Sequence, residues 1–528
     1  MRSLRHENIY EDIGEIGPYQ IFLFSLVGLL AAVPALTGYG FVFIGATPDY
    51  RCKIPIAEHD TFNLKDQSHY DSLVEYIPRT RDKIFNKCNI RQNSTDTSEF
   101  VPCTEWVYST EFYDTTMVTE WNLVCSNFHY KSLYMNLHFI GTCGVVLSGI
   151  LSDRFGRKKI AYILLSLNAL VAVLSAILLN TNTFDLAVKR NLFAVLKLLY
   201  AITSNVYSIA ITLVIELTGP NRRILASNFV AISFVMVSIV LSSVAFFLRN
   251  FQMLSIFIAC VTCLIPTYFW IVPESPRWLI LQKRKTEALR ILGKISKSNK
   301  KPMNFVEEIE SLQNSAVSLY RTSDEKLEFL ELVKFFMKKR LYVFRTFILV
   351  INWTVISAIY YGISFFTEKI PGDPYLNCIL FILVDLVALI FIQMTTERFG
   401  RKVPFTVAMT IGGITFILMT FLPSHSVLST FCALIGKLCI AFALNLSFTI
   451  TSEFYPTFIR NSVTSLLVGI GRGGSVSSTY IHRFGELYKL YNLPFFIFGA
   501  SSLFAGLLFF TFMPETKEKT LPENLDEF

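Results

Sequence analysis

Two ionisable residues lie at the centres of long apolar segments, where a charged side chain is costly. Asp385 is the eleventh of the 21 residues in the segment 375–395, and Arg472 is the eleventh of the 20 residues in the segment 462–481. Ionisable residues at such a depth are functional candidates by default. We expect either that both bind charged groups of a small molecule, or that they pair with each other in a pair that such a molecule opens.

A second set of charged residues recurs at matched places in the two halves of the chain. Asp153-Arg154-Phe155-Gly156-Arg157-Lys158 returns 244 residues later as Glu397-Arg398-Phe399-Gly400-Arg401-Lys402. Matched acids and bases predict a charge network that locks the two halves together and releases them. Ordinary loop charge is the alternative for the basic residues alone. The predicted network comprises Asp153, Arg154, Arg157, Glu216, Arg222, Glu397, Arg401, Glu453 and Arg460.

Helices long enough to cross a membrane must position these residues. Hydrophobic residues make up 52% of the 528 residues and charged residues only 17%, against about 25% charge in soluble domains. Twelve apolar stretches are 19 to 25 residues long, and a bilayer core of about 30 Å requires about 20 helical residues. We expect all twelve to be membrane helices, the first of them retained rather than cleaved as a signal. They are 21–43, 133–151, 160–180, 192–215, 224–247, 253–272, 343–366, 375–395, 404–422, 427–451, 462–481 and 494–513.

The charge of the connecting segments predicts the orientation. The segment 277–345 contains 16 Lys and Arg against 8 Asp and Glu, whereas the segment 46–130 contains 8 against 13. Because basic loops stay in the cytoplasm, we expect both termini inside and 46–130 outside. Amphipathic helices at 286–295 and 304–319 are expected to cover the inner face.

The acidic segment 46–130 has the features of an extracellular domain. It contains four of the ten cysteines: Cys52, Cys88, Cys103 and Cys125. An even number in an oxidising compartment predicts two disulfides, for which three pairings are possible. The sequon Asn93-Ser94-Thr95 predicts glycosylation of Asn93.

Several other classes of protein fit poorly. The seven histidines show no metal-ligand spacing, and the chain has no Walker loop. The net charge of +8 is spread over loops, which favours membrane topology over nucleic-acid binding. We therefore expect neither an enzyme nor an ATP-driven pump, and no metal or cofactor.

The repeat defines the architecture. It spans six apolar stretches, so both halves cross the membrane in the same orientation, which is an arrangement found in transporters. The expected fold is all-α, with twelve transmembrane helices in two six-helix bundles. The predicted divisions are a cytoplasmic N-terminus 1–20, a first bundle 21–272 with an extracellular loop 44–131, a cytoplasmic linker 273–342, a second bundle 343–513 and a cytoplasmic tail 514–528.

These motifs carry a family resemblance. The run from Gly149 to Lys158 resembles the signature of the major facilitator superfamily, and the run from Pro273 to Leu279 resembles its sugar and organic-ion carriers. Thr47 to Cys52, Glu120 to Cys125 and Glu453 to Arg460 are similar to motifs of the organic cation/anion/carnitine transporter family, solute carrier family 22. The resemblance covers essentially the whole chain, although four outer cysteines are fewer than the six typical of vertebrate members. It implies a multi-pass plasma-membrane carrier that works by alternating access.

The resemblance also implies a substrate class. Arg472 stands where cation-type members have an acid and where anion-type and carnitine-type members have Arg. Asp385 matches an acid found across the family, and Leu389 replaces a Lys that anion-type members tend to have. One cation and one anion fit a zwitterion, either carnitine-like or amino-acid-like.

Aromatic residues complete the expected site, because aromatic faces attract quaternary ammonium groups. The resemblance points to Tyr360, Tyr361, Trp353, Tyr207 and Phe448, with Tyr361 and Phe448 favoured; packing or lipid contact is the alternative for each. Lys197 and Lys437 are expected to be structural and to extend toward the membrane surface.

The predicted function is transport of a small organic ion. The alternatives are organic cation uniport, organic anion exchange and a non-transporting receptor with this fold. The co-transported ion and the oligomeric state stay open.

Overall fold

The computed structural model of the chain describes residues 16–54, 60–63, 66–77, 85–91, 100–218, 223–268, 270–301, 340–364, 372–423, 426–455, 460–488, 490 and 492–516. Asn93, Arg222 and the predicted helix 304–319 lie outside these residues. Glu397 and Arg460 lie within helices, but their side chains are outside the described part.

Each of the twelve apolar stretches coincides over most of its length with a helix or a short run of helices. The first half consists of α2 (Pro18–Gly28), η1 (Leu29–Ala31), α3 (Ala32–Ile44), α6 (Phe128–Thr142), α7 (Val145–Phe155), α8 (Arg157–Asn180), α9 (Leu186–Thr203), α10 (Tyr207–Glu216), α11 (Arg223–Leu248) and α12 (Phe251–Tyr268). The second half consists of α17 (Arg340–Ser364), α18 (Pro374–Phe399), α19 (Lys402–Phe421), α20 (Val427–Phe454), α21 (Arg460–Leu487) and α22 (Leu493–Phe512).

Most of these helices have the length and composition of a membrane span. Ten such spans occur within the described residues. The two remaining stretches form α12, which is shorter, and α21, whose composition is more polar. A helix satisfies its own backbone polar groups in lipid, which explains why uniformly apolar stretches adopt this structure. The prediction of an all-α membrane protein is confirmed.

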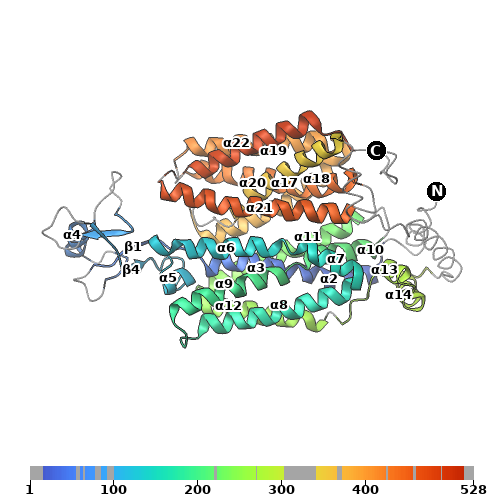
Figure 1. The fold of residues 1–528 in the computed structure, drawn as a ribbon, viewed down its shortest axis with the longest axis horizontal. Helices are drawn as coiled ribbons and strands as arrows, with labels where there is room; N and C mark the ends of the chain where they lie inside the picture. Colours follow the sequence, from blue (N-terminus) through green and yellow to red (C-terminus); the bar gives the residue numbers. More distant parts are fainter. Residues whose placement is uncertain are drawn as a thin grey trace.

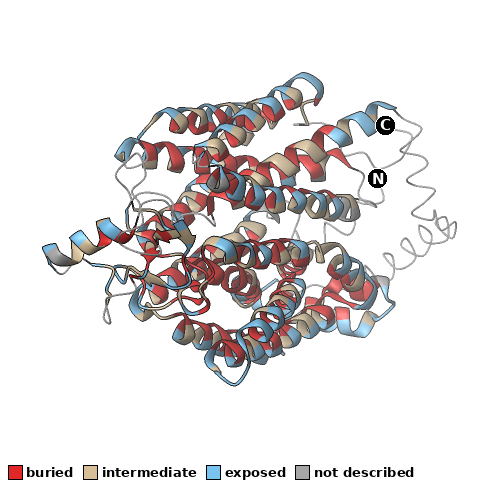
Figure 2. Ribbon diagram, turned by 60° about the vertical axis from the view of Figure 1, so that its left-hand side comes forward, coloured by how far each residue is buried: buried red, intermediate tan, exposed pale blue. Residues whose placement is uncertain are grey.

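The two halves form two groups of helices that lie side by side (Figure 1). They meet mainly where α6 and α7 pack against α21, and where α11 packs against α18. Large apolar residues such as Leu170, Phe421 and Phe504 are exposed on the outer faces of the helices, and Figure 2 shows exposed positions along those faces. Such faces suit contact with lipid.

The connecting segments separate to opposite ends of the helices. The segment with β1 (Tyr50–Cys52), α4 (Gln67–Tyr76) and β4 (Trp106–Tyr108) lies at one end, and α13 (Pro276–Leu281) and α14 (Lys285–Ser298) lie at the other (Figure 1). The predicted helix 286–295 lies within α14. The two segments with opposite charge balance therefore occupy opposite faces of the bundle.

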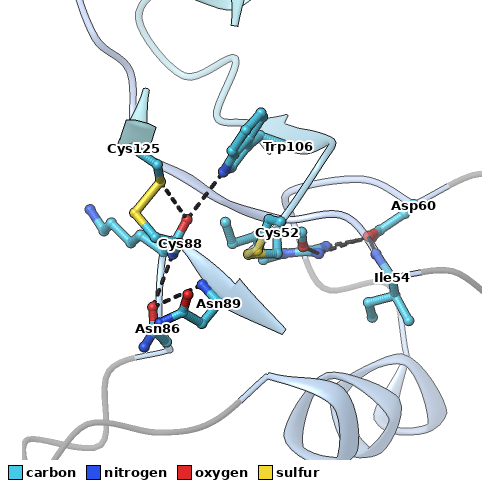
Figure 3. The surroundings of a disulfide bond; sticks show 11 residues. Cys52, Ile54, Asp60, Asn86, Cys88, Asn89, Trp106 and Cys125 are labelled. Atoms are coloured by element: carbon cyan, nitrogen blue, oxygen red, sulfur yellow. Dashed lines mark hydrogen bonds and ion pairs between the residues drawn. A yellow bond between two sulfur atoms is a disulfide. The ribbon is translucent and has the colours of Figure 1, made fainter. Parts of the chain in front are cut away.

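Short strands and two disulfides hold the segment between α3 and α6. Its further elements are β2 (Asn89–Arg91), β3 (Phe100–Pro102), α5 (Met117–Trp121) and η2 (Cys125–Asn127). β1 pairs with β4 and β2 pairs with β3, both antiparallel. Of the three possible pairings, the structure has Cys52–Cys103 and Cys88–Cys125. Figure 3 shows the Cys88–Cys125 bond and its surroundings.

An ion pair adds to this segment. Arg51 and His69 both contact the Asp60 carboxylate, which has no exposed side-chain surface. Burial by itself raises the pKa of Asp60, but hydrogen bonds from Arg51 and from the Ile54 backbone N–H outweigh it and hold that pKa below its ordinary value. Asp60 is therefore a charged anchor of the fold in this segment.

Candidate functional site

The Asp385 carboxylate lies in a buried polar cluster between α17, α18 and α20. Asp373 caps α18 through hydrogen bonds from the N–H groups of Tyr375 and Leu376, and Pro374 begins the helix. Asp385 itself is only 7% exposed. The Tyr360 hydroxyl donates a hydrogen bond to its Oδ2 at 2.7 Å.

Lys437 supplies the opposite charge. Its Nζ lies 3.4 Å from Asp385 Oδ1, and its side chain has no exposed surface. The same Nζ donates to Ser364 Oγ at 2.6 Å and lies 3.1 Å from the centre of the Tyr360 ring. The expectation that Lys437 extends toward the membrane surface is wrong, and the described ion pair of Asp385 is with Lys437 rather than with Arg472.

Arg472 lies on α21, where glycines control how closely the helix approaches α17. A Cβ at Gly474 would overlap the carbonyl group of Thr354, and a Cβ at Gly471 would lie 3.1 Å from the Trp353 carbonyl oxygen, whereas a Cβ at Gly473 would contact nothing within 4 Å. Two of these glycines therefore allow helix packing, and Gly473 leaves free space beside Arg472.

The guanidinium of Arg472 is held by an aromatic face and by no described carboxylate. It lies 4.7 Å from the centre of the Tyr361 ring. Its Nε is buried without a hydrogen-bond partner, and it takes part in none of the ion pairs described for the chain. A cation buried among apolar helices needs an anionic or polar partner, which makes Arg472 a candidate binding residue.

The predicted aromatic residues divide into three groups. Tyr361 contacts Tyr360 and Phe139, with ring centres 5.1 Å and 5.3 Å apart, and so joins α17 to α6 of the first half. Trp353 is 1% exposed and donates its indole N–H to Thr451, so it is a packing residue. It supports Phe448, whose ring centre is 4.7 Å away and which is 40% exposed.

Tyr207 belongs to the first half of the chain but lies within electrostatic range of Tyr361. It starts α10 in the first half, is half-buried, and contacts Phe234 with ring centres 6.0 Å apart. The structure thus brings Tyr360, Tyr361 and Asp385 together, and Arg472 lies beside Tyr361. Phe448 is connected to this cluster through the α17 residue Trp353. Tyr207 belongs to the other bundle.

The sequence contains a signal for the pairing of Lys437 with Asp385 that the expectations above did not use. It is the eleventh residue of the stretch 427–451, and Asp385 is the eleventh residue of 375–395. Both stretches run in the same direction across the membrane, so equal position meant equal depth. That equality was the signal for the pair.

The ion pairs described for the predicted charge network form two corresponding clusters, one in each half. Arg157 Nη2 lies 2.8 Å from Asp153 and 3.0 Å from Glu216. In the second half Arg401 Nη2 lies 2.9 Å from Glu453. Every described ion pair of this network joins residues of the same half. Arg154 is exposed and lies over the Phe155 ring.

A second carboxylate completes each cluster by capping a helix. Glu274 accepts hydrogen bonds from the backbone N–H groups of Arg157 and Lys158, and Glu515 accepts them from Arg401 and Lys402. Burial raises the pKa of Glu274, and these hydrogen bonds oppose that shift. The turns require Gly156 and Gly400, which have φ values of 105° and 77°. The repeat in the sequence is therefore a repeat of structure.

At the opposite end, one aromatic residue joins the two halves. Tyr375 of α18 is 2% exposed, and its ring stacks on Phe43 of α3 with centres 5.4 Å apart. It also contacts Tyr113 and Phe246, and its hydroxyl donates to the Phe112 carbonyl oxygen at 3.1 Å. The first half, the disulfide-bonded segment and the second half all meet at this residue.

Comparison with known proteins identifies the fold and the type of protein. The model of the family "Sugar (and other) transporter" matches residues 69–528. The organic cation transporter protein of Drosophila melanogaster is 29% identical over 99% of this chain and 94% of its own length. Organic cation/carnitine transporter 2 of Homo sapiens is 28% identical over 99% and 93%.

Solved structures agree on the fold. The inward-open xylose transporter XylE from E. coli has a TM-score of 0.63 at 17% identity, covering 96% of this chain and 99% of that one. XylE bound to 6-bromo-6-deoxy-D-glucose has a TM-score of 0.64 at 18% identity, covering 97% and 99%. At such identity the likeness concerns the arrangement of helices alone.

Proposed function

The chain belongs to the sugar (and other) transporter family, and from that premise we propose that it carries carboxylate-bearing organic ions, zwitterions in particular, across the plasma membrane. It has the major facilitator superfamily fold and is a secondary transporter of the organic cation/carnitine type in solute carrier family 22. The substrate class within that type is our proposal.

One observation supports this substrate class. Arg472 has no described carboxylate partner, whereas Asp385 is already paired with Lys437. The cluster of these three residues therefore has one positive charge in excess. A substrate carboxylate at Arg472 would balance it through two parallel hydrogen bonds.

The positive end of a zwitterion has its own partners. The faces of Tyr361 and of the 40% exposed Phe448 offer cation–π contacts. Asp385 becomes available to a cation only when its pair with Lys437 opens. We propose that the carboxylate contact at Arg472 dominates binding and that the aromatic contacts select the cationic group.

An organic cation is the second candidate substrate. It is favoured by the aromatic faces and by the name of the Drosophila relative, an organic cation transporter protein. A cation would gain about 2.3 kcal/mol per charge per 100 mV from an inside-negative potential, whereas a zwitterion gains none unless a co-ion moves with it. Membrane potential therefore separates the two candidates.

The test combines uptake with variants of α21. Cells expressing the protein would be given labelled carnitine, tetraethylammonium and a dicarboxylate, with and without sodium and with and without depolarisation. Arg472→Ala is expected to abolish carnitine uptake, and Arg472→Lys to restore little, because an ammonium group lacks the planar fork. Arg483→Ala, on an exposed position of the same helix, is the matched control. Depolarisation-sensitive uptake of tetraethylammonium that survives Arg472→Ala would replace the proposal with cation uniport.

We propose the orientation in the membrane on charge. The basic end with α13 and α14 is cytoplasmic and the disulfide-bonded end is extracellular, with glycosylation at Asn93. Tags inserted near residue 65 and near residue 320 should be accessible only outside and only inside, respectively. Loss of the mobility shift on glycosidase treatment in Asn93→Gln tests the modification.

A further inference from the structure

Lys197 of α9 carries a buried charge and is not one of the residues proposed to bind the transported substrate. It is 5% exposed, and the other residues that line the cavity beside it all belong to the first half of the chain. Its Nζ donates to the Thr37 carbonyl oxygen at 3.2 Å and lies 4.3 Å from the centre of the Phe41 ring; no carboxylate of the described residues forms an ion pair with it. A carbonyl and an aromatic ring leave the ammonium charge without a counter-charge.

The second half of the chain contains the group that Lys197 lacks among the described residues, a carboxylate partner for the equivalent lysine. Lys437 stands 240 residues after Lys197 and has Asp385 as its partner at 3.4 Å. The offset of 244 residues that relates Asp153 to Glu397 carries Asp385 back to Gly141. A Cβ at Gly141 would lie 2.6 Å from Ala201 Cβ and 2.8 Å from the Leu198 carbonyl oxygen, so no acidic side chain fits there.

Nothing else described on α6 supplies the negative charge. His138, one turn before Gly141, is buried and lies within electrostatic range of Lys197. An imidazole is neutral or positive, so it cannot neutralise an ammonium. Removing one partner of a buried pair is strongly destabilising when the remaining charge is left uncompensated.

A cavity lies beside Lys197 where a counter-ion would be needed. Its volume is about 40 Å³, and Thr37, Phe41, Ser175, Lys197, Tyr200 and Ser255 are among the residues that line it. The Tyr200 hydroxyl is buried at this cavity, within range of the Thr262 hydroxyl. Since one water needs roughly 10–15 Å³ of such volume, the space can hold about three waters or one small ion, and it is too small for an organic substrate.

We propose that this cavity binds a small inorganic anion, with Lys197 as its counter-charge. Chloride has the charge and size that the cavity requires. Lys197 has ammonium protons beyond the one donated to Thr37, and the hydroxyl of Tyr200 is a further donor. The site lies between α3, α8, α9 and α12, so its occupancy stabilises the first bundle and is independent of the substrate proposed at Arg472.

The experiment measures the effect of chloride on purified full-length protein. Thermal unfolding is followed in chloride, bromide and gluconate at constant ionic strength. Chloride is expected to raise the Tm by at least about 2 °C relative to gluconate, and ³⁵Cl NMR should show line broadening that bromide reverses. Lys197→Met should lose both effects. Lys189→Met is the matched control, because Lys189 is buried on the same helix and its Nζ contacts only the neutral Asn182 at 3.1 Å.

A second variant keeps the test decisive if Lys197→Met fails to fold. Ser175→Leu fills the cavity from α8 without changing the charge, so it should abolish the chloride effect and leave the Tm in gluconate unchanged. Equal Tm values in chloride and gluconate for the wild type would overturn the proposal and assign water to the cavity. A chloride effect that persists in both Lys197→Met and Ser175→Leu would overturn it as well.

Discussion

Lys437 and Asp385 form an ion pair of 3.4 Å in the interior of the second bundle, and the lysine side chain has no exposed surface. The pair is supported on both sides, since Ser364 accepts from Lys437 and Tyr360 donates to Asp385. Burying two charges is costly, and their mutual attraction offsets that cost only while both partners are present; Asp385 Oδ1 contacts Lys437 but has no described hydrogen bond. The pair therefore behaves as one unit.

The first prediction concerns the removal of half of this unit. Lys437→Met should destabilise the protein by about 3–5 kcal/mol, because Asp385 would remain buried without a counter-charge. The double variant Lys437→Met/Asp385→Asn should recover most of that loss. Thermal unfolding of the purified variants measures both. Additive losses in the double variant would show that the two side chains act separately.

The second prediction concerns Asp153 in the first-half charge cluster. Its side chain is 54% exposed and pairs with Arg157, so Asp153→Asn should change stability by less than about 1 kcal/mol. We expect uptake at equal surface level to fall several-fold, because the cluster is proposed to act when the halves move. Lys159→Gln, an exposed change in the same turn, is the control. Unchanged uptake in Asp153→Asn would remove the cluster from the mechanism.

The sequence predicted the elements well and the partners of charged residues less well. Twelve apolar stretches and a repeated charge motif are local patterns, so they identified the spans and the matched clusters at Arg157 and Arg401. The pair between Asp385 and Lys437 depends on which helices are neighbours. That information lies in the packing of α18 against α20, which periodicity does not contain.

The glycines near Arg472 show the same limit. Four glycines lie within three residues of Arg472 in the sequence, at positions 469, 471, 473 and 474. In the structure Gly471 and Gly474 serve close contact with α17, and only Gly473 faces open space. A glycine has the same appearance in the sequence whether a neighbouring backbone or a cavity lies beside it.

The third prediction concerns pH and the Asp60 anchor of the disulfide-bonded segment. The pKa of Asp60 is lowered on folding, so its stabilising contribution is complete above the unfolded pKa of about 3.9 and is lost as the pH falls through the lower folded value. Asp60→Asn should therefore weaken hydrogen-exchange protection of this segment at pH 6, and by progressively less as the pH falls below about 3.9. Asp71→Asn, whose carboxylate contacts Gln67 at an exposed position, is the control. A difference from the wild type that does not shrink as the pH falls below about 3.9 would contradict the charge-based role.

The last prediction concerns Tyr375, where both halves and the disulfide-bonded segment meet. Tyr375→Ala removes the ring that stacks on Phe43 and the hydroxyl that contacts Phe112. One turn further along α18, Cys378 is fully buried beside Ser242 of α11, with Sγ and Oγ 3.5 Å apart. If Tyr375 closes this end, its removal should admit water to Cys378.

An impermeant thiol reagent added from outside measures this opening. Labelling of Cys378 should rise at least several-fold in Tyr375→Ala, and the added labelling should disappear when Cys378→Ser is combined with it. Leu376→Ala is the matched control, because Leu376 is the next residue and is 55% exposed on the outer face of α18. Substrate uptake should change in Tyr375→Ala as well, since a carrier that cannot close this end leaves its site exposed to one side. Labelling that stays at the wild-type rate would mean that other contacts between α11 and α18 suffice for closure.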